Sequence, residues 1–199
     1  MSLDIRELRR DEWAEAMTVA ARAFTNMGFI VDMFGADSLT RFALTREFYA
    51  ATPWVDANMH LGAFIGDDLV GAVVATPPGK CQLCLHDSVY EAQLPDDERE
   101  WLGLARATHT PLDPHARIGR LVVEPALQGA GLGSRLLATA LEHLAAHGAD
   151  LVVLECEMPG EPFYTERGFS RLAVITEPGR LGDGSTLAGI DLRPTLDPE

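Results

Sequence analysis

Three glycines stand on alternate positions just before a strongly amphipathic stretch: Gly129, Gly131 and Gly133 in the run VVEPALQGAGLGSRLL. A glycine inside a helix costs about 1 kcal/mol relative to alanine, so this cluster indicates that the backbone itself is needed there. The first turn of a helix offers N–H groups and a partial positive charge, and glycine lets an anionic group approach them. The spacing therefore predicts a phosphate-binding loop, to which Arg135 could add a charge-assisted contact.

The loop lacks the residues that define two common classes of phosphate-binding loop. A dinucleotide-binding fingerprint would place its third glycine at Ser134, and a P-loop would carry a Gly-Lys-Ser/Thr run that is absent. Both classes are therefore excluded. Packing remains the alternative to ligand binding: Gly129 would form the turn, while Gly131 and Gly133 would let the helix approach the sheet closely.

A second candidate site lies earlier in the chain, where Cys81 and Cys84 have C-x-x-C spacing and His86 follows. This is the spacing of half a zinc site or of a redox pair. The other cysteine, Cys156, falls in an apolar run that predicts a core strand, so the second half of such a site is missing. We therefore expect no metal, and we expect reduced thiols because an odd number of cysteines does not describe a disulfide framework.

The elements that must position these residues alternate between helix and strand. Helices are predicted over residues 11–24, with Asp11 as the N-cap, over 38–50 and over 94–107. Residues 58–75 predict a hairpin that turns at Gly66-Asp67-Asp68. From residue 116 onward the pattern predicts a strand at 116–123, the glycine loop, a helix to about 147, a strand at 150–157, a short helix at 161–168 and strands at 169–176 and 185–192. This order of elements predicts an α/β fold.

Length and composition are those of a globular protein. The 199 residues, 47% of them hydrophobic, predict a single domain over 1–199 with a disordered tail at about 193–199. The charged start MSLDIRELRRDEW is unlike a signal peptide, and no apolar run approaches the roughly eighteen residues of a membrane span, so we expect a cytoplasmic protein. A net charge of −14, from 30 acidic and 16 basic residues, argues against nucleic acid and anionic membranes and favours a cationic ligand.

The glycine loop belongs to a longer pattern, V-x-P-x-x-Q-G-x-G-x-G, which begins at Val123 and includes Pro125 and Gln128. This pattern resembles the acetyl-CoA loop of the GNAT superfamily of N-acetyltransferases. The later run PFYTERGF, Pro162 to Phe169, is similar to the short helix and following strand of that family. The resemblance is specific over residues 118–172, where LECEMPGEPFYTERGF is most similar to puromycin-acetyltransferase-like members. The first half of the chain matches only in its order of two helices and a hairpin.

The resemblance implies a mixed central sheet of about six to seven strands, flanked by helices and splayed between the fourth and fifth strands. The pantetheine arm of acetyl-CoA would lie in that gap, and loop N–H groups would hold the pyrophosphate. The residues that the resemblance implies for coenzyme binding are Leu121, Val122, Val123, Gln128, Gly129, Ala130, Gly131, Leu132, Gly133, Ser134 and Arg135. Many relatives carry an asparagine where this chain has Gly160-Glu161, a departure that concerns one side-chain contact to the coenzyme.

Tyr164 is the implied general acid, because it matches a tyrosine that the family often uses to protonate the departing thiolate. Simple packing of its ring, as for Phe163, is the alternative. The strand before the glycine loop has no carboxylate where some relatives place a base, so Glu155 and Glu157 are the candidates. They share one face of a strand and can take the amine proton directly or through water, although a solvated strand end explains Glu157 equally well.

Together these features predict an acetyl-CoA-dependent N-acetyltransferase that acts on the amine of a small molecule by direct attack on the thioester. A non-catalytic acyl-CoA-binding sensor or interaction module is the alternative, and a cysteine-metal protein is the third hypothesis. Acceptor determinants are expected in the first two helices and in residues 77–114. The closing pair of strands could mediate a homodimer.

Overall fold

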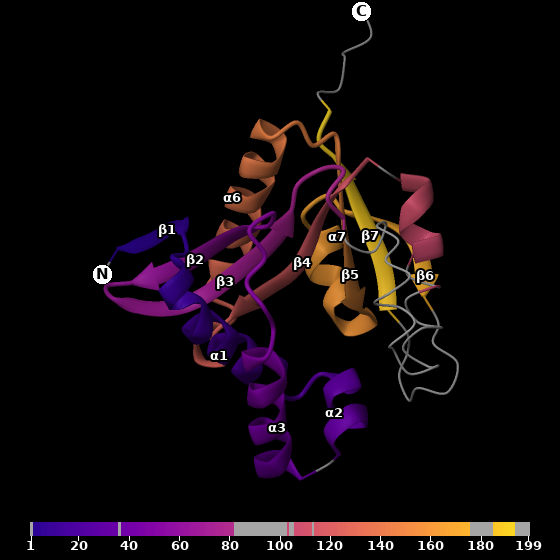
Figure 1. The fold of residues 1–199 in the computed structure, drawn as a ribbon. Coiled ribbons are helices and arrows are strands. Elements are labelled where there is room, and N and C mark those ends of the chain that lie inside the picture. Colours follow the sequence, from indigo (N-terminus) through magenta and orange to yellow (C-terminus); the bar gives the residue numbers. More distant parts are fainter. Residues whose placement is uncertain are drawn as a thin grey trace, which may run out of the picture. The chain divides into compact units, whose positions relative to one another are not determined.

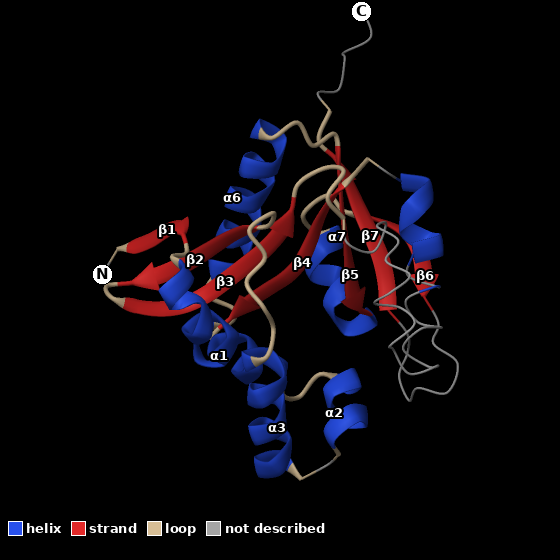
Figure 2. Ribbon diagram, viewed as in Figure 1, coloured by secondary structure: helices blue, strands red, loops and turns tan. Residues whose placement is uncertain are grey.

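The computed structural model describes residues 2–35, 37–81, 103, 106–112, 114–175 and 185–193 (Figures 1 and 2). The strands are β1 (Leu3–Glu7), β2 (Met59–Ile65), β3 (Asp68–Thr76), β4 (Ala116–Val123), β5 (Leu151–Glu157), β6 (Ser170–Ile175) and β7 (Ser185–Asp191). The α-helices are α1 (Trp13–Phe24), α2 (Gly28–Phe34), α3 (Ser38–Ala50), α6 (Leu132–Ala146) and α7 (Glu161–Thr165). Short 3₁₀ turns are η1 (Arg10–Glu12), η2 (Thr110–Leu112), η3 (Pro125–Leu127) and η4 (Met158–Gly160).

The strands form one seven-stranded sheet in the order β1-β2-β3-β4-β5-β7-β6, which confirms the predicted α/β class with a central sheet and flanking helices. The chain divides into two compact units. The first contains the described residues up to Ala75 together with Ile118–His143, and the second contains those of Thr76–Arg117 and from Leu144 onward. The predicted splay concerns strands of different units and stays a prediction, as does the single domain. The helix predicted at 94–107 lies largely outside the described residues.

The first unit is built on the antiparallel strands β1, β2 and β3. Gly66, with φ of +65°, makes the tight turn that pairs Ile65 with Asp68, so the predicted hairpin is confirmed. A bulge follows at Ala63/Phe64, where the register shifts by one residue. The long apolar runs of β2 and β3 are buried on both faces, as expected for strands covered on both sides.

Helices α1 and α6 cover opposite faces of β3. Ala72 and Val74 share a buried cluster with Met17 and other residues of α1. Neighbouring residues in a strand point to opposite faces, and a Cβ added at Gly71 would lie 2.9 Å from both Cδ1 of Leu136 in α6 and the carbonyl oxygen of Val122 in β4. The glycine therefore allows β3, β4 and α6 to pack closely.

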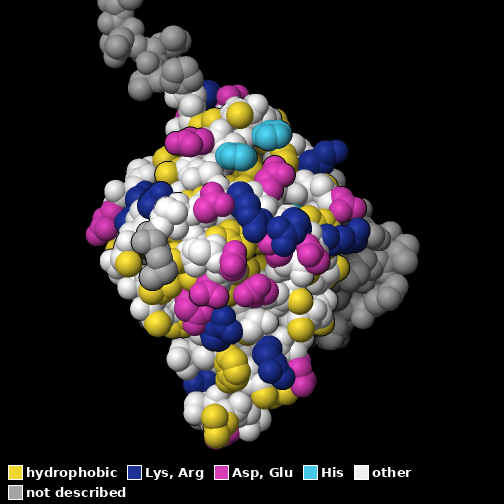
Figure 3. Space-filling view, turned by 90° about the vertical axis from the view of Figure 1, so that its left-hand side faces the viewer, with side chains coloured by type: hydrophobic (Ala, Val, Ile, Leu, Met, Phe, Trp, Pro, Cys, Tyr) yellow, Lys and Arg dark blue, Asp and Glu magenta, His cyan; other side chains and the backbone are white. Residues whose placement is uncertain are grey.

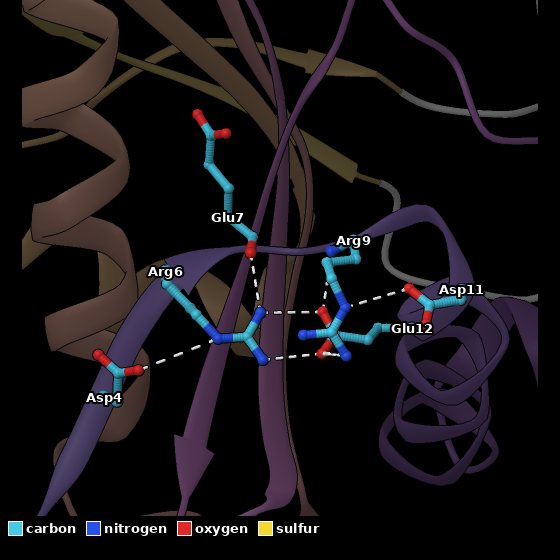
Figure 4. A network of polar contacts seen from close by, with 6 residues as sticks. All are labelled: Asp4, Arg6, Glu7, Arg9, Asp11 and Glu12. Carbon is cyan, nitrogen blue, oxygen red and sulfur yellow. Dashed lines mark hydrogen bonds and ion pairs between the residues drawn. The ribbon is translucent and has the colours of Figure 1, made fainter.

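The start of α1 differs from the prediction. A 3₁₀ turn precedes the helix, and Glu12 rather than Asp11 satisfies a backbone donor, because its carboxylate accepts from Arg9 N at 2.8 Å. Arg6 of β1 donates to both oxygens of Glu12 at 2.9 and 2.7 Å, and among the residues of this network Asp11 contacts Arg9 alone (Figure 4). The network connects the end of β1 with the turn that begins α1.

The second unit contains β5, β7 and β6, paired antiparallel in that order. Val153 of β5 and Leu187 of β7 are fully buried and form the centre of a small apolar cluster. Glu161, in the first turn of α7, accepts from Nε of Arg171 in β6 at 2.7 Å, which ties the short helix to the sheet. This unit also holds Tyr164 and both candidate carboxylates.

Two observations concern membrane-spanning segments and the distribution of surface charge. Within the part of the chain that the structure describes, no helix has the length and apolarity that crossing a membrane would require. On the face drawn in Figure 3, acidic side chains lie among basic ones rather than in a separate patch.

Candidate active site

The glycine loop, Gln128–Ser134, leads from η3 into α6. Gly129 and Gly131 have φ angles of +80° and +81°, a backbone region that disfavours residues with a side chain. Apart from atoms of the adjoining residues, no atom of the described chain lies within 4 Å of a Cβ built on either glycine. Among the described residues, therefore, no close neighbour requires glycine at position 131, whereas its backbone conformation does.

The loop before α6 is exposed at residues 128–131. Arg135 N donates to the carbonyl of Gly131 at 3.2 Å, so the amides of Leu132 and Gly133 precede this first hydrogen bond of the helix. The N-terminal dipole and the exposed loop backbone suit an anionic group such as a phosphate. Arg135 is exposed on the same turn.

The strand before the loop is held in place by the loop itself. Gln128 donates from Nε2 to the carbonyl of Val123 at 3.2 Å, so the glutamine of the sequence pattern braces the end of β4. Val122 and Val123 are buried and Leu121 is half-buried. Just beyond the strand, Glu124 accepts from Nε of Arg22 at 2.8 and 3.0 Å, which ties the start of the loop to α1.

Tyr164 lies in α7, where its ring packs edge-on against Phe163 and Phe169. Burial raises the pKa of its phenol well above the usual range, and Cys156 adds to this effect. The phenol is therefore protonated at neutral pH, which is the state that a proton donor needs. The ring contacts agree with the packing alternative, and the donor role stays a prediction.

Glu155 lies on β5 and is paired with two cationic or potentially cationic groups. Burial would raise its pKa, but Arg117 and His109 together lower the pKa to about 2. Arg117 donates from Nε to the two carboxylate oxygens at 3.2 and 3.0 Å, and Nε2 of His109 lies 2.7 Å from Oε1. Because an ionised carboxylate only accepts hydrogen bonds, Nε2 of His109 carries a proton. Glu157 is two residues further along the strand and half-buried.

Sequence reasoning missed the residues that surround Glu155. Cys81, His109 and His115 are fully or almost fully buried, with exposed fractions of 1%, 0% and 0%. Sγ of Cys81 lies 3.8 Å from Nδ1 of His109, which lies 3.0 Å from Nε2 of His115. The C-x-x-C spacing drew notice to Cys81, but Cys84 and His86 lie outside the described residues. No motif connects Cys81 with the two histidines that it meets.

Charge within this cluster favours a thiolate and an imidazolium. Burial alone would raise the pKa of the Cys81 thiol, but hydrogen bonding to His109 and His115 lowers it to about 5. Burial would lower the pKa of His109, whereas Cys81 and Glu155 raise it to about 9. By contrast, burial first, then Glu161 and Glu155, raise the pKa of Cys156 to about 11, so its thiol stays protonated.

The structure thus places the predicted site residues in two sets. The glycine loop and residues 121–123 belong to the first unit, while Tyr164, Glu155 and Glu157 belong to the second. The first set forms an open loop at a helix N-terminus, and the second contains a protonated phenol in α7 and two carboxylates on β5.

The model of the acetyltransferase (GNAT) family matches residues 13–169 of the chain. A search of characterised protein sequences found no significant match. Three solved structures illustrate the likeness in fold. The PaiA N-acetyltransferase of Thermoplasma acidophilum, in complex with coenzyme A, has 15% identity and a TM-score of 0.61, covering 96% of this chain and 99% of that chain.

An arylalkylamine N-acetyltransferase-like protein from mosquito has 15% identity and a TM-score of 0.63, covering 96% and 100% of the two chains. The ribosomal-protein-S18-alanine N-acetyltransferase of Escherichia coli has 14% identity and a TM-score of 0.57, covering 96% and 94%. At such identities the likeness establishes the fold. The names of the three structures indicate that this fold serves acceptors as different as a small amine and a protein.

Proposed function

Because the chain belongs to the GNAT acetyltransferase family, we propose that it transfers the acetyl group of acetyl-CoA to the amine of a small molecule. The observation that carries the proposal is the glycine loop, in which two left-handed glycines open the N-terminus of α6 to an anionic ligand. The backbone groups of residues 128–134 are proposed to hold the pyrophosphate. Leu121, Val122 and Val123 are proposed to contact the pantetheine arm.

The reaction requires one bond to form and one to break. The amine nitrogen bonds to the carbonyl carbon of the thioester, and the carbon–sulfur bond breaks. The nitrogen loses a proton and the departing sulfur gains one, which leaves an amide and free coenzyme A. Proton transfer at each of these atoms is therefore where side chains can contribute.

Tyr164 is the proposed donor of the proton to sulfur, since its phenol is protonated at neutral pH and a positioned acid lowers the barrier. We assign removal of the amine proton to Glu157, directly or through water. Glu155 lies on the same side of β5, but its carboxylate is engaged by Arg117 and His109, and its low pKa makes it a weak base. Its contribution in this proposal is to hold those two side chains.

Release of free thiol from acetyl-CoA, measured with a panel of acceptors, tests the proposal. The panel contains an arylalkylamine, an aliphatic diamine, a peptide with N-terminal alanine and a lysine-containing peptide, with an amine-free reaction as the control for hydrolysis. We expect turnover with at least one small amine, and kcat/KM for the peptides at least tenfold lower. Turnover with a peptide alone would overturn the small-molecule acceptor.

A non-catalytic acyl-CoA-binding module is the second candidate function. The observation that favours it is the pairing of Glu155 with Arg117 and His109, because this pairing leaves Glu157 as the one candidate base of the two. The same assay separates the two candidates when calorimetry accompanies it. Coenzyme A that binds tightly while no acceptor releases thiol would identify the module. Binding together with amine-dependent thiol release would identify the enzyme.

A further inference from the structure

We propose that Cys81, His109 and His115 bind a transition-metal ion, and that zinc best matches their chemistry. The proposal does not depend on the acetyl-transfer reaction. The three residues come from separate segments of the second unit: Cys81 follows β3, His109 precedes η2 and His115 precedes β4. Their potential ligand atoms, one sulfur and two ring nitrogens, all lie within 4.8 Å of one another.

Two of the three separations between these atoms are close to those of a tetrahedral site. Zinc binds cysteine sulfur at about 2.3 Å and histidine nitrogen at about 2.0 Å, which at a tetrahedral angle separates sulfur from nitrogen by about 3.5 Å and two nitrogens by about 3.3 Å. The observed separations are 3.8 Å between Sγ of Cys81 and Nδ1 of His109, and 3.0 Å between the two ring nitrogens. Shifts of about 0.4 Å or less would bring these two pairs to zinc geometry.

The side chain of Glu155 supplies the support that metal-binding histidines usually have. A histidine that coordinates a metal through one ring nitrogen commonly donates its other N–H to a carboxylate, which fixes the tautomer and the ring orientation. Nε2 of His109 makes this contact with Glu155 at 2.7 Å, so its Nδ1 faces Cys81 and His115. Arg117 in turn holds Glu155, with its nearest nitrogen 2.8 Å from Oε2.

His115 is the residue that a metal-free cluster accounts for least well. Its Nε2 meets Nδ1 of His109, while its Nδ1 is buried and has no hydrogen-bond partner among the described residues. A metal bound at Nε2 would give this ring a strong bond that fixes its position. The hydrogen that the two histidines share in the metal-free state would then leave the cluster, whereas the Cys81 sulfur, already a thiolate, would bind without losing a proton.

The ligand set decides the class of metal. A thiolate with two imidazoles favours zinc and other late first-row metals over magnesium and calcium, which prefer oxygen. Three protein ligands also leave a fourth position for water or another donor. Because three separate segments meet at the ion, it would fasten them together, and the bound ion would stabilise the second unit.

Titration of the wild-type protein with cobalt(II), followed by zinc(II), is the first test. We expect one equivalent of cobalt to bind with thiolate-to-cobalt charge-transfer absorption and the intense d–d bands of tetrahedral coordination, and we expect zinc to displace it. Elemental analysis after dialysis should then give about one zinc per chain. A folded wild-type protein that binds cobalt without the thiolate absorption would overturn the proposal, as would one that binds neither metal.

Variants assign the ligands. Cys81→Ala and His115→Ala should each lower the affinity for cobalt at least a hundredfold, and Cys81→Ala should abolish the charge-transfer absorption. Cys156→Ala is the matched control, because Cys156 is a half-buried thiol of the same unit that lies outside the cluster. Wild-type affinity in folded Cys81→Ala or His115→Ala protein would overturn the assignment. Circular dichroism of each variant establishes that it is folded.

A third comparison examines the support from Glu155. Loss of a carboxylate that orients a metal-bound histidine typically costs 10- to 100-fold in metal affinity, so Glu155→Gln should weaken binding by that factor while still reaching one equivalent. Glu157→Gln removes a carboxylate two residues away on the same strand and should leave the affinity unchanged. Equal affinities in these two variants would overturn the supporting role of Glu155.

Discussion

Replacement of Glu12 by glutamine should destabilise the first unit by removing the charge at the centre of a network. The Glu12 side chain is only 10% exposed, and its carboxylate accepts from Arg6 at 2.9 and 2.7 Å and from Arg9 N at 2.8 Å. Arg6 holds both oxygens of Glu12 with its planar guanidinium (Figure 4). The same guanidinium lies 3.9 Å from the centroid of the Phe64 ring. The change keeps the size of the side chain.

The size of the effect follows from the pKa of Glu12. The hydrogen bonds from Arg6 lower this pKa from 4.5 to about 2, despite the opposing effect of burial. That difference corresponds to about 3 kcal/mol of folding free energy. Arg6 and Arg9 are 36% and 64% exposed, so solvent screens part of it, and we expect about 2 kcal/mol at pH 7.

The same pKa sets the pH dependence. Because the folded-state pKa lies below the unfolded-state value, the stabilisation is complete well above pH 4.5 and is lost as the pH falls from there towards 2. The free energies of unfolding of the wild-type and Glu12→Gln proteins should therefore differ by about 2 kcal/mol at pH 7. At pH 4 this difference should be smaller by about 0.8 kcal/mol.

Urea unfolding followed by tryptophan fluorescence at both pH values measures this difference. Asp11→Asn is the matched control, since Asp11 is 75% exposed and contacts only the side chain of Arg9 within the network, and it should change the stability by about 0.5 kcal/mol or less. If Glu12→Gln cost no more than Asp11→Asn, or if its cost were the same at pH 7 and pH 4, the reasoning would be refuted.

Three further predictions concern catalysis. Tyr164→Phe should lower kcat by about 10²- to 10⁴-fold without changing the Kd of acetyl-CoA, whereas Tyr49→Phe, at a buried tyrosine of the first unit, should leave kcat nearly unchanged; equal effects would reject the donor role. Gly131→Ala should weaken coenzyme A binding, measured by calorimetry, more than the control Gly148→Ala, which introduces the same left-handed strain at the other end of α6. Equal affinities of the two variants for coenzyme A would reject binding by the glycine loop. Added salt should lower kcat/KM for a cationic amine because it screens the charge of −14, and a flat profile with saturating acetyl-CoA would leave solubility as the role of the acidic residues.

Elements with a strong local pattern were predictable from the sequence. The strand at 116–123 and the helix at 38–50 have the bounds that the pattern predicted, and the helix after the glycine loop begins at Leu132. Proline or glycine marks an end of each of these elements, and α6 buries one apolar face with Leu136, Leu137, Ala140 and Leu144. In α3 only the bounds were predictable, because Leu39 is 81% exposed and the buried residues include Arg41 and Thr45.

Elements that depend on their neighbours were missed. The five residues of β1, LDIRE, include three charged residues, and the strand exists because it pairs with β2, with Ile5 opposite Ala63. Helix α2 has seven residues, starts at a glycine and has no side-chain cap, so the usual start signals are lacking. Tertiary contacts, which no local pattern records, decide both elements.

The candidate site divides in the same way. The glycine loop and the short helix around Tyr164 are contiguous motifs, and the sequence located both. The cluster around Glu155 is assembled from residues far apart in the chain: Cys81 and His109 are separated by 28 positions, and His109 and Glu155 by 46. A lone histidine in a sequence carries no sign of its partners, so this cluster could be found only in the folded chain.

Gly71 and Gly131 are both required to be glycine, but evolution can act on the two positions very differently. At Gly131 the obstacle is its own backbone angle, and asparagine or aspartate, which visit the left-handed region most readily, offer the chain a partial escape. At Gly71 the obstacle is its surroundings, since a Cβ would meet Leu136 and the carbonyl of Val122. A smaller residue at Leu136 would relieve only the first contact, because the second is with backbone that every residue shares. Position 71 therefore stays closed to substitution for as long as β3 and β4 keep their spacing, whatever happens to the side chains around it.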